Sequence, residues 1–303
     1  KNCKIFLFFL DCPKKFYLKI MEKIDIIIPT YNRAKTLKRA IESVLRQTYK
    51  DFNLIIVDDG STDNTEEVVK SFNDKRVNYI RCNKNKGAAI ARNIGIKMSK
   101  NNFIAFLDSD DEWVPKKLEI QIKILENSID KIGGVFSSVY MFYKDKIMYW
   151  PRLRIFQDDI YGILLYRNVI APSAVLLKRE CFLKFGLFDS RFKSYMDWDL
   201  FFRFSKYYHF KYIEEPLAFL YRQKDSIYKN YKLQGHSMFL IKHRRFFKDK
   251  KIKNFHLINF VSLFKKDFNY KKFFYFVKVI IYYPIIIYFI LKSYVSKRSH
   301  LGK

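Results

Sequence analysis

Three carboxylates follow directly on a hydrophobic run in the stretch NFIAFLDSDDEWVP (residues 102–115). Phe103 to Leu107 suits a buried strand, and Asp108, Asp110 and Asp111 come within four positions of its end. Ionised carboxylates this close repel one another and seldom pack together without a counter-charge. The cluster is therefore either a solvated turn, where aspartate is common, or a site for a cation, most simply a metal ion.

Polar residues at three other places have types that carry chemistry. TYNR (residues 30–33) and DDGSTD (residues 58–63) each follow an apolar run, and Asp197 and Asp199 lie in SYMDWDLFFRFS. An aspartate with the ordinary pKa of about 4 is ionised at neutral pH and can accept a proton as a general base. For Asp197 the simpler alternative is a helix cap. Because a helix repeats every 3.6 residues, Asp199 should face away from Asp197.

The segments around these clusters alternate between strand-like and helix-like patterns. Apolar runs predict strands over 24–29, 52–59, 77–82 and 103–107, and helical spacing predicts helices over 34–48, 61–72, 87–99 and 115–128. This alternation predicts a parallel sheet with right-handed crossovers and helices on both faces. In such sheets ligands bind outside the carboxyl ends of the strands. The clusters after strands one, two and four should therefore converge on one ligand site, which we favour over three solvated turns.

The ordered motifs resemble those of a known family. IIIPTYNRAKTLKRAIESVLRQTYKDFNLIIVDDGSTDNT, followed by NKGAAIARNIGI and FIAFLDSDDEW, is similar to the family-two glycosyltransferases with the GT-A fold, over roughly residues 24–221. The resemblance implies an α/β protein with a Rossmann-like, mainly parallel sheet flanked by helices. It also implies an enzyme that transfers a sugar, with inversion, from a nucleotide-sugar donor that usually carries UDP.

The resemblance assigns the acid cluster to the metal and the donor. Asp110 matches the metal-binding end of the family's DxD motif, and Asp108 should lie near the ribose or the metal. Asp111 matches an adjacent acid that some members use, so the metal ligand is Asp110, Asp111 or both. The implied ion is Mg²⁺ or Mn²⁺, which needs only one or two protein carboxylates besides phosphate and water.

The other expected contacts to the nucleotide sugar come from the first strands and the third helix. Asp59 resembles the acid that hydrogen-bonds the uracil ring, and Tyr31 resembles the aromatic residue that stacks on it. Thr30 belongs to the same motif as Tyr31. Arg33 and Arg92 are candidates to contact the phosphates or to hold the acids in place.

The second half of the chain should bind the acceptor. The family usually has Glu-Asp before an aromatic residue, with the Asp as general base; here Met196 stands at the Glu position and Asp197 at the Asp position. Asp197 is thus the expected base and Asp199 its rival. Lys224 stands where the family often has His, so a metal ligand is not expected there. One separate base suffices for direct displacement, so we expect an α-linked donor to give a β-linked product.

Composition points to a membrane surface. The chain has 303 residues, 31 Phe, 22 Tyr and a net charge of +28, and its four cysteines show no zinc or disulfide spacing, which fits a reducing compartment. From Ser226 onward the chain has 18 Lys and Arg residues but only two acidic ones, and this part includes the apolar stretch 273–291. An interfacial helical hairpin on an anionic membrane is favoured, with a membrane span or a soluble core helix as alternatives. No nucleic-acid motif occurs.

The predicted organisation follows from these signals. Residues 1–20 are expected to be upstream or poorly ordered sequence, 21–225 a GT-A domain with a nucleotide-sugar half (21–115) and an acceptor half (116–225), and 226–303 a helical, basic and aromatic extension. We expect peripheral binding at the cytoplasmic face of a membrane and a glycan or lipid-linked acceptor. A sugar nucleotidyltransferase would need a Gly-rich, Arg-containing loop after strand one, which PTYNRAKT lacks. A non-catalytic nucleotide-sugar-binding protein is the other alternative.

Overall fold

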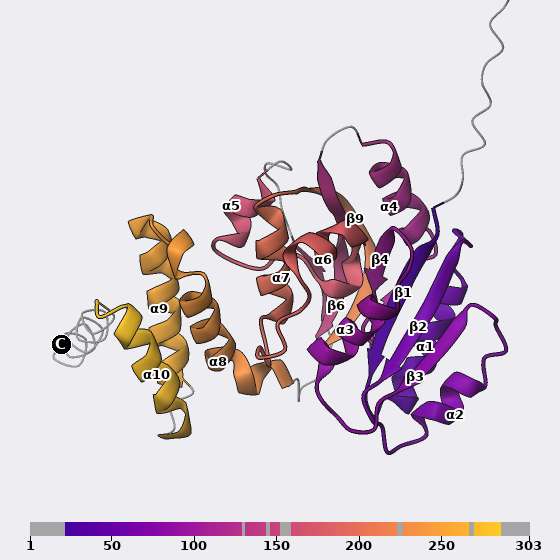
Figure 1. Cartoon of the computed structure of the whole chain (residues 1–303), viewed down its shortest axis with the longest axis horizontal. Coiled ribbons are helices and arrows are strands. Elements are labelled where there is room, and N and C mark those ends of the chain that lie inside the picture. The colour runs from indigo at the N-terminus through magenta and orange to yellow at the C-terminus, as the bar shows by residue number, and fades with distance from the viewer. Residues whose placement is uncertain are drawn as a thin grey trace, which may run out of the picture.

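The protein is built on one nine-stranded sheet with helices packed against it (Figure 1). The computed structural model describes residues 22–128, 131–143, 146–151, 159–222, 227–266 and 270–285. The strand order is β3-β2-β1-β4-β8-β6-β9-β5, with β7 paired to β6. The strands are β1 Ile24–Thr30, β2 Phe52–Asp58, β3 Val77–Arg81, β4 Phe103–Phe106, β5 Glu112–Trp113, β6 Ile132–Tyr143, β7 Lys146–Trp150, β8 Val175–Lys178 and β9 His209–Arg222. The helices are α1 Ala34–Leu45, α2 Thr65–Lys70, α3 Ala88–Met98, α4 Lys117–Glu126, α5 Ile160–Leu164, α6 Arg179–Phe185, α7 Met196–Ser205, α8 Ile227–Lys242, α9 Lys250–Lys266 and α10 Tyr270–Tyr282, with 3₁₀ turns η1 Pro172–Ala174 and η2 Arg244–Phe246.

The N-terminal half of the sheet is parallel, as the alternation of strands and helices predicts. Strands β3, β2, β1 and β4 pair in parallel, and all seven residues of β1 are buried because helices cover both faces. Ile24, Ile26 and Ile28 pack with α1, α2 and α4, whereas Ile27 packs on the side of α3. Helix α3 lies so close that a Cβ on Gly95 would come within 2.5 Å of Ile27 Cγ2.

The C-terminal half makes the sheet mixed. Strand β8 runs antiparallel to both β4 and β6, and β9 runs parallel to β6. After the acid cluster, β5 pairs antiparallel with β9, with Glu112 opposite Phe219. This pairing brings the end of β9 to the carboxyl end of β4, where the three acids lie.

Helices α8, α9 and α10 follow the sheet as the expected helical extension (left side of Figure 1). Helix α8 packs on α7, with the rings of Trp198 and Phe239 stacked 4.4 Å apart. Among the described residues no helix combines the length and apolar character needed to cross a bilayer. Residues 1–20, Lys224 and the end of the 273–291 stretch lie outside the described residues, so the expectations made for them stay untested.

Candidate active site

A cavity of about 660 Å³ opens at the carboxyl edge of the sheet. Its size is ordinary for a small-molecule site. The charged and amide side chains of its lining come from the loops after β1 and β4, the segment between α5 and η1, α7 and the end of β9: Arg33, Asp108, Asp110, Asp111, Asn168, Asp197 and Arg222. The predicted metal cluster and the predicted base therefore face one space, although they are far apart in the sequence.

Asp111 is held in place by two donors. Ser173 Oγ donates to Asp111 Oδ2 at 2.6 Å, and the backbone N–H of Tyr221 donates to Oδ1 at 3.2 Å. The side chain is buried, and burial together with the charges of Asp108 and Asp110 raises its pKa well above the ordinary value. The orientation of this carboxylate is thus fixed by η1 and β9.

Asp108 is paired with Arg92, which projects from α3. Arg92 Nη2 lies 2.5 Å from Asp108 Oδ1, and the backbone N–H of Asp108 donates to Ser173 Oγ. Arg92 is 6% exposed, and its Nε has no hydrogen-bond partner among the described residues. Its Nη1 donates to the sulfur of Met196 at 3.4 Å. Met196, at the position where the family usually has Glu, thus contacts the arginine that holds Asp108.

Asp110 lies between two arginines. Arg33 Nη2 is 3.8 Å from Asp110 Oδ2, and Arg39 Nη2 donates to the backbone carbonyl of Asp110 at 2.6 Å. Arg39 also stacks over the ring of Tyr221, 3.8 Å from its centroid. Burial and the charge of Asp108 still raise the pKa of Asp110 above its ordinary value, because the arginines offset these effects only in part.

Asp197 lies in the first turn of α7 and lines the cavity. The residue before the helix is Tyr195, with φ of 67°, so Asp197 does not occupy the cap position itself. Asn168 Nδ2 donates to Asp197 Oδ2 at 2.9 Å. The expectation of an ordinary pKa is wrong: burial raises the pKa of Asp197, and the N–H of Trp198 and the charge of Arg92 lower it only in part.

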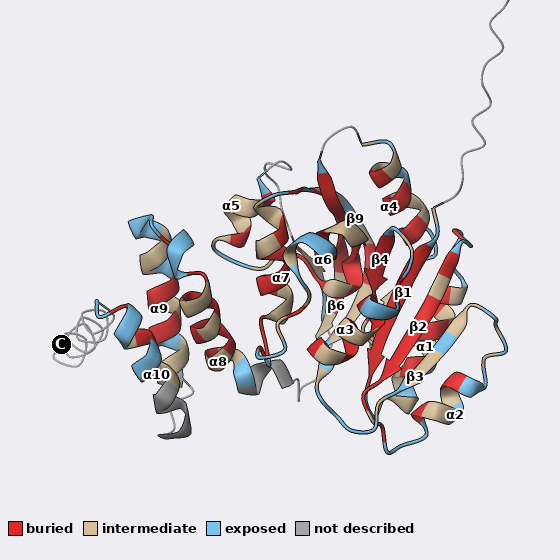
Figure 2. Ribbon diagram, in the orientation of Figure 1, coloured by how far each residue is buried: buried red, intermediate tan, exposed pale blue. Residues whose placement is uncertain are grey.

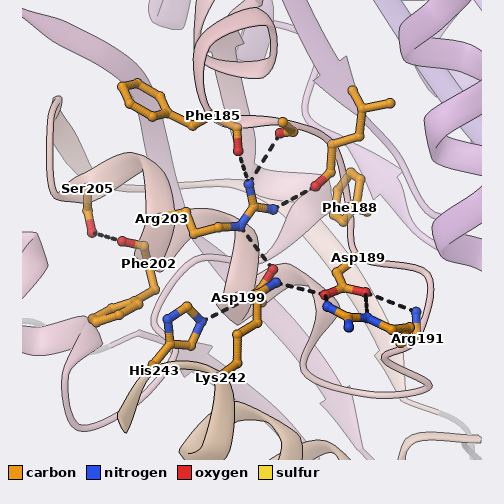
Figure 3. Close-up of polar contacts among 12 residues, drawn as sticks. Phe185, Phe188, Asp189, Arg191, Asp199, Phe202, Arg203, Ser205, Lys242 and His243 are labelled. Carbon is orange, nitrogen blue, oxygen red and sulfur yellow. Dashed lines mark hydrogen bonds and ion pairs between the residues drawn. The ribbon is translucent and has the colours of Figure 1, made fainter. Parts of the chain in front are cut away.

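Asp199 lies on the other side of α7, in an ion network with α8 (Figure 3). It is fully buried, and Lys242 Nζ and His243 Nε2 approach its Oδ1 at 2.7 and 2.8 Å, while Arg203 Nε is 3.1 Å from its Oδ2. Burial would raise the pKa of Asp199, but the hydrogen bond from His243 and the charges of Arg203 and Lys242 lower it overall. As predicted from helical geometry, it faces away from Asp197, and it does not line the cavity.

The residues predicted to bind the nucleotide base lie at the same carboxyl edge of the sheet, after β1 and β2. Tyr31 is 41% exposed, whereas Thr30 is buried and its Oγ1 has no hydrogen-bond partner among the described residues. Asp59 is buried and accepts hydrogen bonds from the backbone N–H groups of Lys86 and Gly87 at 2.6–3.0 Å. None of these three lines the 660 Å³ cavity, and their contacts to uracil stay a prediction.

Asp59 nevertheless shapes a second hollow beside the first. Lys86 and Gly87, which it holds, line a hollow of about 480 Å³ together with Arg92 and Lys193. Asp108 and Asp197 line both hollows, so the two spaces meet at these carboxylates. A ligand with two parts could therefore occupy both hollows, one on each side of Asp108 and Asp197.

Two loops at this edge are joined by hydrogen bonds between residues about thirty positions apart. The N–H of Asn32 donates to Ser61 Oγ at 2.9 Å, and the N–H of Thr62 donates to Asn32 Oδ1 at 2.8 Å. The N–H of Ala34 donates to Asp63 Oδ2 at 3.1 Å. Much of the DDGSTD motif thus holds the loops that follow β1 and β2.

Three positioning residues are not singled out by the sequence. Ser173 holds Asp111 and the backbone of Asp108, Asn168 holds Asp197, and Arg39 holds the loop at Asp110. Arg39 lies within a stretch that resembles the family, but the resemblance assigns no role to it. Their roles follow only from contacts between distant segments.

The carboxylates fit a divalent ion shared with a substrate. Among the described residues no three His, Cys, Asp or Glu side chains form a group that could hold a metal by themselves. Burial, and after it the negative charge of the neighbouring aspartates, raises the pKa values of Asp110 and Asp111, and a bound cation would relieve the crowded negative charge. Mg²⁺ and Mn²⁺ commonly take one or two protein carboxylates and complete their shell with phosphate and water.

Comparison with known proteins agrees with this geometry. The model of "Glycosyl transferase family 2" matches residues 25–184. The chain is 41% identical over 160 residues to the Escherichia coli UDP-Glc:alpha-D-GlcNAc-diphosphoundecaprenol beta-1,3-glucosyltransferase WfaP, a match that covers 52% of this chain and 62% of WfaP. It is 32% identical over 187 residues to the putative colanic acid biosynthesis glycosyl transferase WcaA of E. coli K12, covering 59% of this chain and 65% of WcaA.

Solved structures share the fold at low identity. S. aureus TarS 1-349 in complex with UDP-GlcNAc superposes with a TM-score of 0.65 at 15% identity, over 85% of this chain and 79% of that one. The mannosyltransferase PcManGT from Pyrobaculum calidifontis, in complex with GDP-Man and Mn2+, gives 0.58 at 16% identity, over 90% and 84%. The match spans less than two thirds of the length of each of these two relatives. The family model, the relatives and the fold agree: the chain belongs to glycosyl transferase family 2 and has the GT-A fold.

Proposed function

We propose that this enzyme transfers a sugar from a UDP-linked donor to a hydroxyl of a glycan or lipid-linked acceptor, with inversion. The observation that carries the proposal is that Asp197 and the cluster of Asp108, Asp110 and Asp111 line one cavity. A base and a site for the leaving diphosphate on opposite sides of the sugar are what direct displacement requires.

Asp197 is the proposed base. Burial raises its pKa, and a carboxylate with a raised pKa is a stronger base than an ordinary aspartate. Asn168 fixes the orientation of its Oδ2. The carboxylate would take the proton of the acceptor hydroxyl while the hydroxyl oxygen attacks the anomeric carbon from the face opposite the diphosphate.

The acid cluster and the arginines are proposed to receive the diphosphate. Asp110 and Asp111 would hold Mg²⁺ or Mn²⁺, which stabilises the negative charge on the departing nucleotide diphosphate when bound. Arg33, which lines the cavity beside Asp110, is placed to contact phosphate oxygens. Arg92 pairs with Asp108 and would orient it for the donor.

Two further proposals concern the partners. The relative WfaP is named for UDP-Glc, a diphosphoundecaprenol-linked acceptor and a β-1,3 linkage, and this supports a UDP donor and a lipid-linked acceptor here. The basic, aromatic extension from residue 226 supports peripheral attachment to an anionic membrane at its cytoplasmic face. Residues 21–115 would bind the donor and 116–225 the acceptor.

The test is a panel of nucleotide sugars assayed with the full chain for donor hydrolysis and for transfer to a diphospho-lipid acceptor. We expect activity with one UDP-sugar, its loss in excess chelator, its recovery with Mg²⁺ or Mn²⁺, and a β-linked product by NMR. Asp110→Ala should remove nearly all turnover without a change in folding. An α-linked product, turnover that ignores the chelator, or wild-type rates in Asp110→Ala would contradict the mechanism.

A further inference from the structure

The C-terminal helices contain a third hollow, which is remote from the sheet edge. It measures about 820 Å³ and is lined by η2, the loop after it, α9 and the end of α10. Its side chains are of two kinds, cations (Arg244, Arg245, Lys248 and Lys253) and aromatic rings, among them Tyr282. No carboxylate of the described residues lines it.

The four cations are not neutralised by the described part of the chain. None of them forms an ion pair with a described carboxylate, whereas Lys242 and His243, directly before them, both contact Asp199. The nearest acid in sequence, Asp249, accepts the backbone N–H groups of Lys251 and Ile252 at the start of α9. Like charges gathered without a partner favour the binding of an anion.

Arg244 is already oriented within the hollow. Its Nη1 donates to the carbonyl of Ile241 at 3.1 Å, and its guanidinium carbon lies 4.9 Å from the centroid of the Tyr282 ring. Arginine held against an aromatic ring keeps donors free for phosphate oxygens. Arg245 and Lys248 are exposed beside it.

Apolar side chains are exposed next to these cations. Ile281 and Tyr282 at the end of α10 are 69% and 48% exposed, and Phe246 in η2 and Ile285 are exposed as well. Figure 2 shows this end of the helical extension with exposed segments on α10 and α9. Aliphatic and aromatic groups beside a basic cluster are typical of surfaces that enter the headgroup region of a bilayer.

We propose that this hollow binds the phosphate of an anionic phospholipid headgroup, with Phe246, Ile281, Tyr282 and Ile285 entering the interfacial layer. The inference deepens the proposed membrane attachment by naming the site that makes it. A free phosphate or a nucleic-acid backbone would account for the cations but not for aliphatic side chains exposed beside them, so the lipid is the occupant that both observations favour.

The experiment is flotation of the full chain with vesicles of phosphatidylglycerol and phosphatidylethanolamine, and with vesicles of phosphatidylcholine alone, at 0.1 M and 0.5 M salt. We expect binding to the anionic vesicles only, weaker at the higher salt. The double variant Arg245→Glu/Lys248→Glu, which leaves Arg244 on its ring, should lower the bound fraction at least tenfold. Ile281→Ser/Ile285→Ser should lower binding at both salt concentrations.

The matched control reverses two exposed lysines elsewhere, Lys50→Glu/Lys75→Glu, in the loops before β2 and β3 at the other end of the molecule (Figure 1). It makes the same change in net charge and should bind vesicles nearly as wild type does. Equal losses in the control and in Arg245→Glu/Lys248→Glu would overturn the site in favour of a general charge effect. Circular dichroism melting checks that each variant is folded.

Three further arms identify the ligand and separate this inference from the proposed reaction. Inorganic phosphate at millimolar concentration should not displace vesicles, and a labelled single-stranded RNA should not bind more tightly than the vesicles; either result would overturn the lipid assignment. Donor hydrolysis should be unchanged in Arg245→Glu/Lys248→Glu. An inactive wild type that still floats in a manner sensitive to these two residues would contradict the proposed function and leave the lipid site standing.

Discussion

Helix α7 presents Asp197 and Asp199, two residues apart, to two different regions of the molecule. Asp197 faces the cavity, where burial raises its pKa and the neutral amide of Asn168 donates a hydrogen bond to it. Asp199 faces α8, where burial is outweighed by His243, Arg203 and Lys242 and its pKa is lowered (Figure 3). Surroundings, and not residue type, thus leave one carboxylate available for a reaction and commit the other to holding helices together.

The largest expected effect is on turnover in Asp197→Asn. Loss of a positioned general base should lower kcat for sugar transfer by about 10²–10⁴-fold. Donor affinity should persist, and the free energy of unfolding should stay the same or rise, because a raised pKa means that the ionised group is less favourable in the folded chain than in the unfolded one. Steady-state kinetics, calorimetric donor binding and urea unfolding measure these three quantities. A smaller loss of turnover than in Asp199→Asn would reverse the roles of the two acids.

Asp199→Asn should do the opposite, costing stability and little catalysis. Removing one partner of a buried pair typically costs about 3–5 kcal/mol; we expect about 2–3 kcal/mol here, since Arg203 and Lys242 keep part of their surface in water. Turnover per folded molecule should stay within a few-fold of wild type. Urea unfolding with activity measured well below the midpoint tests both statements. Unchanged stability would show that the network adds nothing to the packing of α7 on α8.

The region around Asp199 should also be sensitive to mild acid. His236, His243 and His256 are buried there with lowered pKa values, to about 3 for His236, so they are neutral in the folded protein. Below the unfolded pKa of about 6.5 the unfolded chain binds more protons than the folded one. The free energy of unfolding should therefore decrease as the pH is lowered, by up to about 1.4 kcal/mol per pH unit for each histidine. Urea unfolding at pH 7.5 and 5.0 measures the slope, which His236→Gln should reduce. A slope equal to that of wild type in this variant would exclude His236 as a contributor.

The smallest expected effect comes from Asn168→Ala, at the cavity side. The variant loses the hydrogen bond to the charged form of Asp197, which should raise the pKa of this carboxyl further and lower kcat mainly on the acidic side of the pH profile, where less of the base is ionised. The acidic limb of the kcat/KM profile should move to higher pH, since the base must be ionised. An acidic limb at the wild-type pH, with kcat reduced, would show that Asn168 acts through something other than Asp197.

The sequence predicts the part of the structure that depends on local pattern. The strands from Ile24 to Phe106 and the helices between them follow from apolar runs and helical spacing. The convergence of Asp108 and Asp110 with Asp197 follows from the family resemblance and from the rule that ligands bind at the carboxyl ends of the strands. The mixed half of the sheet is different, because nothing local indicates that β8 runs antiparallel to β4.

Contacts between distant residues set the remaining properties. The lowered pKa of Asp199 depends on Lys242 and His243 in the next helix, and the raised pKa of Asp197 depends on how deeply α7 is packed. The sequence assigns no role to Ser173 or Asn168, yet each orients one of the cavity acids. Side-chain types in a sequence indicate which chemistry is available, while tertiary packing decides which copy of a residue performs it.

The joined loops after β1 and β2 have a thermodynamic consequence. A loop that becomes ordered only when a ligand binds subtracts its lost conformational entropy from the affinity. Here the backbone of Asn32, Ser61 and Thr62 is already tied together by hydrogen bonds in the free protein. A ligand that binds at this edge therefore meets a surface whose shape is already set, so its affinity is not reduced by the cost of ordering these two loops.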